Sequence, residues 1–370
     1  MGNLTEEQML KPEPYVRGKT LSVIKNVEVG KVNRVINLSQ NESCYGTPQS
    51  VFDAIEERVK TIERYADVNC NGMREAIGKV YDIDPDLIIC GNGSEELLDA
   101  IGRIYARSGD EILYPEYSFL QFPIVAYRVG ATPVSVANKE NFALDVDGVL
   151  DAVTEKTKVL YVANPNNPTG VYTPRSEINR LVEELPKHVV LVLDAAYAEY
   201  CDADDYTDGM EYVGRNSNVV VTRTLSKAYG LAGIRAGWAY TNAEIAAAMN
   251  NMRGIGNVNA LAQAASIAAI KEQDFIKDVR QKNKLERNRC NQALMALGIK
   301  VIETETNFLL LYLPDVKGHS SGAALKFLAL RGVMTRTNED YGLDDYLRIS
   351  LGKIEDNNFV LELMTEFMST

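Results

Sequence analysis

Histidine is almost absent from this sequence of 370 residues, since only His188 and His319 occur and they lie far apart. Ser-His-Asp triads and histidine-containing metal sites both need imidazole groups close to their partners. None of the five cysteines stands at the Cys-x-x-Cys spacing of many metal and redox sites. The sequence therefore argues against a histidine-dependent hydrolase and against a bound metal.

An excess of positive charge and a long apolar run are also lacking. The 39 Lys and Arg residues are outnumbered by 51 Asp and Glu residues, which gives a formal net charge of −12. This balance argues against binding to nucleic acid or to an anionic membrane. No apolar run reaches the roughly 18 residues that span a membrane, and residues 1–20 lack a signal-peptide core. We therefore expect a cytoplasmic protein with reduced cysteines.

The first two thirds of the chain contain short apolar runs separated by segments with a helical pattern. They cover residues 87–90, 111–114, 158–163, 189–193 and 219–221. This alternation predicts an α/β fold with a mainly parallel central sheet covered by helices on both faces. The carboxyl ends of its strands would lie along one edge, where open α/β sheets bind ligands.

The pattern changes beyond about residue 240, where long helices over 241–252 and 260–295 and scattered short strands are expected. This change indicates a second, smaller α+β domain. The predicted organisation has three parts: an N-terminal arm over 1–40 that joins the small domain, a large domain over 41–250, and a small C-terminal domain over 251–370.

The segment after the last apolar run carries a reactive set of side chains. Lys227 follows the hydroxyl residues Thr224 and Ser226, and Arg235 stands eight positions further on. Lysine forms Schiff bases when burial or cationic neighbours lower its pKa, and hydroxyl and guanidinium groups suit a phosphate. Together they match the needs of pyridoxal 5′-phosphate (PLP). Taken alone, Lys227 is more simply interpreted as a solvated loop residue.

Other strand ends carry groups that suit the ring of such a cofactor. Asp194 could pair with a pyridine nitrogen, although aspartate at a strand end also caps helices. Tyr197 and Asn167 could donate to a ring phenolate, although Asn-Pro also marks turns. Tyr117 could stack on the ring, although a single tyrosine is more often half-buried core.

The predicted start of one helix could bind the phosphate of such a cofactor. Gly93-Ser94-Glu95 follows an apolar run, and the free N–H groups of a helix N-terminus favour anions. The Gly91-x-Gly93 spacing alone is equally compatible with a plain turn.

These segments together resemble the PLP-dependent aminotransferases of fold type I, in their class I and II group. The matching motifs are Asn-Pro-x-Asn-Pro-Thr-Gly at 164–170, Asp-x-x-Tyr at 194–197 and Ser-Lys-x-x-Gly-Leu-x-Gly-x-Arg at 226–235. Within the group the chain most resembles the histidinol-phosphate aminotransferases, through residues 14–19, 91–97, 257–265 and 347–350. The resemblance covers nearly the whole chain.

The resemblance implies a role for each matching cofactor residue. Lys227 would form the Schiff base and later move the proton, while Asp194 would bind the ring nitrogen. Tyr197 and Asn167 would bind the phenolate oxygen, and Tyr117 would stack on the ring. The cofactor phosphate would be held by Gly93, Ser94, Glu95, Thr224, Ser226 and Arg235.

Substrate and subunit roles are implied in the same way. Arg348 would clamp the carboxylate or phosphate of the substrate, with Asn41 beside it, and Tyr15 and Arg336 would line a distal anion site. Arg336 could instead form a structural salt bridge, for example to Asp344 or Asp345. Tyr65 matches a tyrosine lent to the neighbouring subunit's cofactor phosphate, which implies a homodimer with shared active sites.

The implied activity is amino-group exchange between a small anionic amine or amino acid and 2-oxoglutarate or glutamate. A PLP-dependent decarboxylase of a phosphorylated or phosphono amino acid and an aromatic amino-acid aminotransferase are alternatives. A PLP-sensing regulator would need a DNA-binding module, for which the chain has no room. Departures from the family pattern at Ser43, Cys44 and 254–256 leave the amino donor open.

Overall fold

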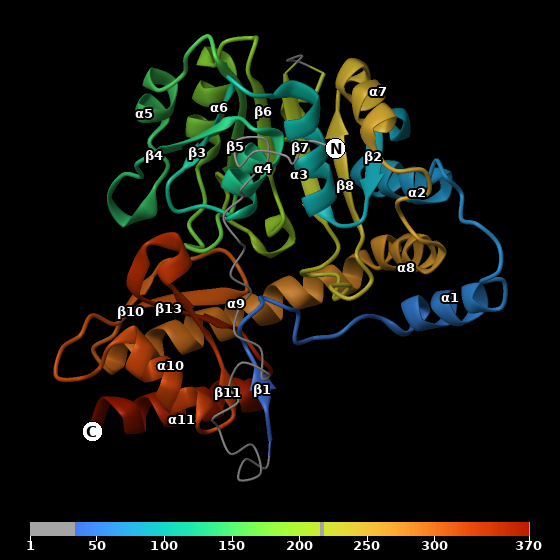
Figure 1. Ribbon diagram of the computed structural model, residues 1–370. Coiled ribbons are helices and arrows are strands. Elements are labelled where there is room, and N and C mark those ends of the chain that lie inside the picture. The colour runs from blue at the N-terminus through green and yellow to red at the C-terminus, as the bar shows by residue number, and fades with distance from the viewer. Residues whose placement is uncertain (1–33, 215–217, 370) are drawn as a thin grey trace, which may run out of the picture.

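The computed structural model describes residues 34–214 and 218–369. Its largest feature is a seven-stranded sheet with the strand order β2-β8-β7-β6-β5-β3-β4 (Figure 1). The five expected apolar runs all lie in this sheet. They form β2 (Ile88–Gly91), β3 (Glu111–Pro115), β5 (Thr157–Ala163), β6 (Val190–Asp194) and β7 (Val219–Thr224).

Two strands of this sheet were not predicted. β4 (Thr132–Val136) is an edge strand with partly exposed residues, so it lacks an apolar run. β8 (Gly237–Thr241) is fully buried but directly follows the glycine-rich lysine segment, which hides it in the sequence. β8 pairs antiparallel with β2 and β7, whereas the β3–β4, β3–β5, β5–β6 and β6–β7 pairs are parallel.

Helices cover both faces of the large sheet, as expected. Alternate residues of β5 point to opposite faces, so Tyr161 packs in one apolar cluster and Leu160 in another. The first cluster includes α3 (Ser94–Tyr105), α4 (Gln121–Val129) and α7 (Ala243–Met252), and the second includes α5 (Val146–Asp151) and α6 (Arg175–Glu184). The α/β prediction is therefore confirmed.

A smaller antiparallel sheet follows, with the order β12-β13-β10-β9. It lies below the large sheet in the view of Figure 1, and the long helix α9 (Gln273–Ala296) packs against it. Its elements are β9 (Lys300–Ile302), β10 (Phe308–Tyr312), β12 (Arg336–Asn338), β13 (Leu343–Ser350), α10 (Ser321–Ala329) and α11 (Ile354–Ser369). β1 (Ile36–Asn37) pairs with β11 (Val333–Met334) in a separate two-stranded sheet, so this part of the arm contacts the C-terminal part of the chain.

The expected helix over 260–295 is two helices, because Glu272 interrupts it between α8 (Ala260–Lys271) and α9. α8 packs against α1 (Gln49–Val59) and α2 (Asn71–Tyr81) of the N-terminal half. The domain boundary near residue 250 stays a prediction. Within the described residues, none of the helices combines the length and the apolar character needed to cross a membrane.

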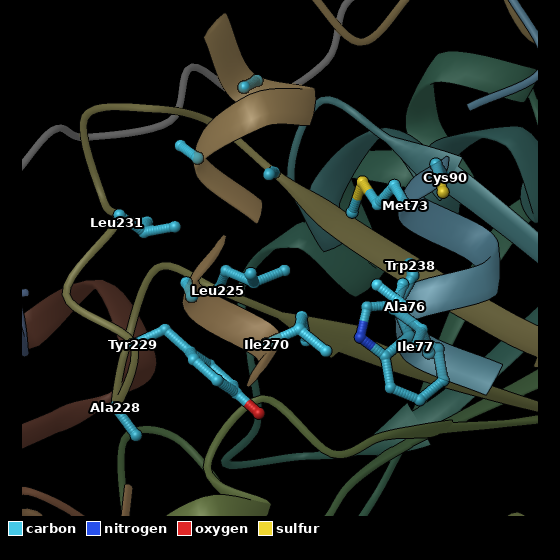
Figure 2. Packing of buried hydrophobic residues seen from close by; sticks show 14 of the residues in the cluster. Met73, Ala76, Ile77, Cys90, Leu225, Ala228, Tyr229, Leu231, Trp238 and Ile270 are labelled. Atoms are coloured by element: carbon cyan, nitrogen blue, oxygen red, sulfur yellow. The ribbon is translucent and has the colours of Figure 1, made fainter. Parts of the chain in front are cut away.

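Apolar packing fixes the lysine segment from both sides of Lys227. Leu225 precedes the lysine, Ala228 and Tyr229 follow it, and all three are buried. Figure 2 shows them in one cluster with residues of α2, such as Ile77, and with Trp238 of β8. A rigid apolar base therefore holds a loop that is otherwise rich in glycine.

Candidate functional site

A pocket of about 160 Å³ opens at the edge of the large sheet where its parallel strands end. One buried water needs only roughly 10–15 Å³ by a comparable measure, so this pocket has room for a small organic molecule. Nine predicted cofactor residues line it: Ser94, Glu95, Asn167, Asp194, Tyr197, Thr224, Ser226, Lys227 and Arg235.

Lys227 extends into this pocket from the loop after β7. Its Nζ donates to the Gln40 carbonyl oxygen at 3.2 Å and lies 5.7 Å from the centre of the Tyr197 ring. Burial, reinforced by the positive charge of Arg348, lowers the lysine pKa to about 8. A substantial fraction of the amine is therefore neutral near physiological pH, which is the form that attacks a carbonyl carbon.

Asp194 ends β6 and is buried at the pocket wall. Its Oδ1 accepts a hydrogen bond from Thr222 Oγ1 on the neighbouring strand β7 at 2.9 Å. Burial raises the pKa of this carboxyl to about 6. Its side chain caps no helix described in the structure, so the N-cap interpretation is wrong, and the carboxylate is available to a cationic group in the pocket.

The N-terminus of α3 forms one end of the pocket. Gly93 precedes the helix with a φ of +85°, in the region that favours glycine. A Cβ on Gly93 would lie 2.5 Å from Arg235 Nη2, and one on Gly237 would lie 2.5 Å from the Ser94 nitrogen. These glycines let a guanidinium and a helix N-terminus approach each other, which produces a concave site suited to an anion.

Two hydroxyl groups complete that anion site. Ser226 Oγ accepts from Thr224 Oγ1 at 3.0 Å and from Arg235 Nη1 at 3.2 Å. The nearest carboxylate to Arg235 is that of Glu95, whose Oε2 lies 3.9 Å from Nη2. This contact is too long for a close hydrogen bond, so the guanidinium retains donors for a ligand.

Tyr197 lies beneath the Lys227 amine, and its ring meets Phe308 of β10 edge-on, with centroids 5.5 Å apart. Asn41 Nδ2 donates to its hydroxyl oxygen at 2.9 Å. Burial raises the pKa of Tyr197, so the hydroxyl stays protonated. Asn41 is buried and both of its amide groups bond within the protein, since Oδ1 accepts from Ser350 Oγ at 3.0 Å.

Arg348, on β13 of the small sheet, does not line the pocket but bonds to Asn167, which does. It is buried, and its guanidinium donates to Asn167 Oδ1 and to the Ser39 carbonyl oxygen. The bond to Oδ1 leaves the amide N–H groups of Asn167, a residue of the pocket lining, available as donors. Among the described residues, no carboxylate lies within ion-pair distance of Arg348, and its Nε has no hydrogen-bond partner.

Arg336 faces Arg348 across the β12–β13 pair. In contrast to Arg348, it forms an ion pair, in which Nη2 donates to Asp340 Oδ2. The alternative of a structural salt bridge is therefore realised, although the partner is Asp340 and neither Asp344 nor Asp345. An aspartate four positions away on a tight turn was the signal in the sequence that could have identified it.

Two further predicted residues of the described chain, Tyr117 and Tyr65, do not line the pocket. Phe119, close to Tyr117 in the sequence, does line it. Tyr65 is fully exposed in the single chain, with a relative accessibility of 101%. Tyr15 lies outside the described residues. Phe119, Thr222 and Ser350 were missed, although Ser350 stands in the segment 347–350 that the resemblance already marked.

The donor set fits the predicted cofactor. A lysine amine, a buried carboxylate and an anion site occur in one pocket, at the ends of adjacent strands. A phosphorylated pyridine aldehyde needs these three groups: an amine for the aldehyde, a carboxylate for the ring nitrogen and donors for the phosphate.

Comparisons with known proteins agree with this chemistry. The family model "Aminotransferase class I and II" matches residues 33–362. The chain is 41% identical to a histidinol-phosphate aminotransferase of Rhodopseudomonas palustris over 355 residues, which cover 96% of this chain and 95% of the relative. It is 40% identical to the protein of the same name from Paramagnetospirillum magneticum, with 96% of each covered.

A solved structure is similar over most of its length. The histidinol-phosphate aminotransferase of Sinorhizobium meliloti, in complex with pyridoxal-5′-phosphate, superposes with a TM-score of 0.84. Its sequence is 27% identical, and the match covers 91% of each chain.

Proposed function

Because the chain belongs to the class I and II aminotransferases, we propose that it exchanges an amino group between histidinol phosphate, or a closely similar anionic amine, and 2-oxoglutarate. The observation that carries the proposal is the pocket itself, which Lys227 lines together with the buried carboxylate of Asp194 and the residues of the anion site. The names of the relatives at about 40% identity support the amino donor.

In this proposal, PLP bound in the pocket supplies the ring that takes up the electron pair left when a proton leaves the substrate carbon. Asp194 would hold a proton on the ring nitrogen by charge pairing. Lys227 would bind the aldehyde carbon covalently and, after the substrate amine displaces it, carry the proton. Its lowered pKa supports both roles, since each needs a neutral amine.

Groups on both sheets would hold the rest of the cofactor. The N–H groups of Gly93, Ser94 and Glu95 and the side chains of Thr224, Ser226 and Arg235 would bind the phosphate. Tyr197 and Asn167 would donate to the phenolate oxygen, since the bond from Arg348 leaves the amide N–H groups of Asn167 available as donors. Stacking by Tyr117 stays a proposal beside the pocket-lining Phe119.

An anionic part of the substrate would bind near Arg348. Because the described part of the chain offers this buried guanidinium only neutral oxygens, its charge has no counter-ion there, and an incoming carboxylate or phosphate would be favoured. Arg336, half-buried on the adjacent strand, would add a second positive charge if its ion pair with Asp340 weakened. Asn41 lies beside this region.

The fully exposed Tyr65 supports a homodimer with shared sites. It stands on an exposed turn with Ile62, after α1, and that turn bonds to α8 through the Asp67 carbonyl oxygen and Gln263 Nε2. Ile255, just before α8, is also almost fully exposed, at 95%. Such apolar exposure suits a subunit interface, across which the Tyr65 hydroxyl would reach the partner's phosphate.

A donor panel tests the proposal. The purified protein, saturated with PLP, would be given 2-oxoglutarate and histidinol phosphate, phenylalanine, or a phosphorylated amino acid, and both glutamate and carbon dioxide would be measured. We expect glutamate to form fastest with histidinol phosphate. Carbon dioxide release without glutamate would indicate a decarboxylase, and a preference for phenylalanine would indicate an aromatic aminotransferase.

A further inference from the structure

Three segments far apart in the sequence meet at Asn41. Its side chain bonds to Tyr197, which follows β6, and to Ser350 at the end of β13. Asn307, just before β10, donates from Nδ2 to the carbonyl oxygens of Asn41 and Glu42, at 3.0 and 3.2 Å. All but Glu42 are buried, so solvent does not compete for these bonds.

The backbone at Asn41 explains part of its identity. Its φ is +56°, in the left-handed region, where asparagine is tolerated better than most other residues. Glycine would adopt this conformation more easily, but glycine has no side chain to reach Tyr197. The position therefore needs both the turn and the amide.

The direction of the hydrogen bond between Asn41 and Tyr197 follows from the bonds of Ser350. Its Oγ accepts from the Asn41 backbone nitrogen at 2.8 Å and donates to Asn41 Oδ1 at 3.0 Å. With Oδ1 occupied in this way, Nδ2 faces Tyr197 and donates to its hydroxyl oxygen at 2.9 Å. In the reversed amide, the Ser350 hydroxyl hydrogen would lack an acceptor among the described residues, and a buried unpaired donor is unfavourable.

We propose that Asn41 and Ser350 are positioning residues that direct the Tyr197 hydroxyl hydrogen into the pocket. Because the tyrosine oxygen already accepts from Asn41, its own hydrogen is free to point toward the phenolate oxygen of the bound cofactor. The inference rests on the proposed cofactor site and extends it: a serine of the small sheet sets the direction of a hydrogen bond made at the large sheet.

The spectrum of the bound cofactor can report this direction. A donor to the phenolate oxygen favours its ionised form, so loss of the donor raises the pKa of the cofactor's absorbance transition. The charged groups that face Tyr197 are Lys227 from its own sheet, Asp194 on β6, Arg348 on β13 and Arg336 on β12. All of them are unchanged in the variants below, so their contribution to the pKa should stay constant.

The test is a double-mutant cycle on the holoenzyme, read by absorbance against pH. Tyr197→Phe deletes the donor and should raise the pKa by about one to two pH units, the range expected for a hydrogen bond to a charged group. Ser350→Ala should raise it by roughly half a unit or more. In the Tyr197→Phe background, Ser350→Ala should add nothing, since the hydroxyl through which it acts is gone.

Two further variants serve as controls. Ser350→Thr keeps the hydroxyl and should keep the original pKa. Ser266→Ala removes another buried serine hydroxyl, one that donates to the Ala262 carbonyl oxygen in α8, and should not move the pKa.

The possible results are distinct. An unchanged pKa in Ser350→Ala, or the same rise with and without the Tyr197 hydroxyl, would overturn the inference and leave the cofactor site intact. No cofactor band in the unmodified protein would instead overturn the proposed function, and this inference with it.

Discussion

The large sheet and the small sheet differ in how the charges in and beside the pocket are compensated. On the large-sheet side, Asp194 and Lys227 have pKa values moved toward neutrality, to about 6 and about 8, and both belong to segments that end adjacent strands. On the small-sheet side, Arg348 is buried and, within residues 34–214 and 218–369, donates only to neutral oxygens, while Arg336 is already paired with Asp340. The large-sheet side would suit the permanently bound cofactor. The small-sheet side would suit an anionic substrate that binds and dissociates in each turnover.

Of all the changes proposed here, removal of the lysine amine on the large-sheet side should reduce activity most. Lys227→Ala should lower kcat by about 10³-fold or more, because the group proposed to move the proton is lost. Single-turnover and steady-state rates would be measured with the cofactor bound. Lys277→Ala removes an exposed lysine paired with Asp274 and should leave kcat unchanged. Comparable rates in Lys227→Ala and the original protein would reject this assignment of the site.

Replacement of the carboxyl group of Asp194 should have opposite effects on activity and on stability. Asp194→Asn should lower kcat by about 100-fold or more, because a neutral amide cannot pair with a protonated ring nitrogen. The folded-state pKa of Asp194, about 6, lies above its ordinary 3.8, so its ionisation destabilises the fold as pH rises through this window.

Denaturation of the cofactor-free Asp194→Asn variant would measure that destabilisation. At pH 7 the variant should be more stable than the original protein by about 2–3 kcal/mol, and this gain should disappear below about pH 3, where the carboxyl is protonated in both the folded and the unfolded state. A loss of stability at pH 7 would mean that the carboxylate has a compensating partner in the folded protein.

On the small-sheet side, the contributions of Arg336 and Arg348 to substrate recognition can be measured separately. Arg336→Lys should lower kcat/KM for histidinol phosphate by about 10-fold or more, and Arg348→Lys by a larger factor, since hydrogen bonds to charged groups contribute about 1.5–3 kcal/mol. Histidinol, which lacks the phosphate, should be affected less by Arg336→Lys. Arg331→Lys alters an ion pair with Glu366 at the surface and serves as the control. Equal losses on both amines would assign Arg336 to its salt bridge alone.

The smallest effect is expected at the exposed tyrosine. Tyr65→Phe should weaken PLP binding by roughly 10-fold, the effect of one hydrogen bond to a phosphate, without changing the stability of the cofactor-free subunit. Fluorescence titration with PLP would measure the affinity. In mixed dimers of Lys227→Ala and Tyr65→Ala chains, partial activity should return because one site of each dimer keeps both groups. Heterodimers without activity would argue against shared sites.

The cofactor side could be predicted from the sequence because each of its groups lies within a short segment. An apolar run predicts a buried strand, the residues after it must lie at the strand's end, and parallel strands bring their ends to one edge. Lys227, Asp194 and Asn167 therefore needed no long-range information, and the structure brings all three into one pocket. Local chemistry and the period of the sheet determined this half of the site.

Tertiary structure alone decided which groups on the other side are partnered. The sequence places Arg348 in a matched segment and offers Arg336 a nearby aspartate, but it does not show which contacts form. The β12–β13 pairing and a turn give Arg336 a carboxylate and leave Arg348, among the described residues, with neutral oxygens. The bond from Ser350 through Asn41 to Tyr197 spans 309 and then 156 positions. Hydrogen bonds depend on ångström distances and angles between groups that chain separation does not encode, so their partners emerge only when the two sheets pack together.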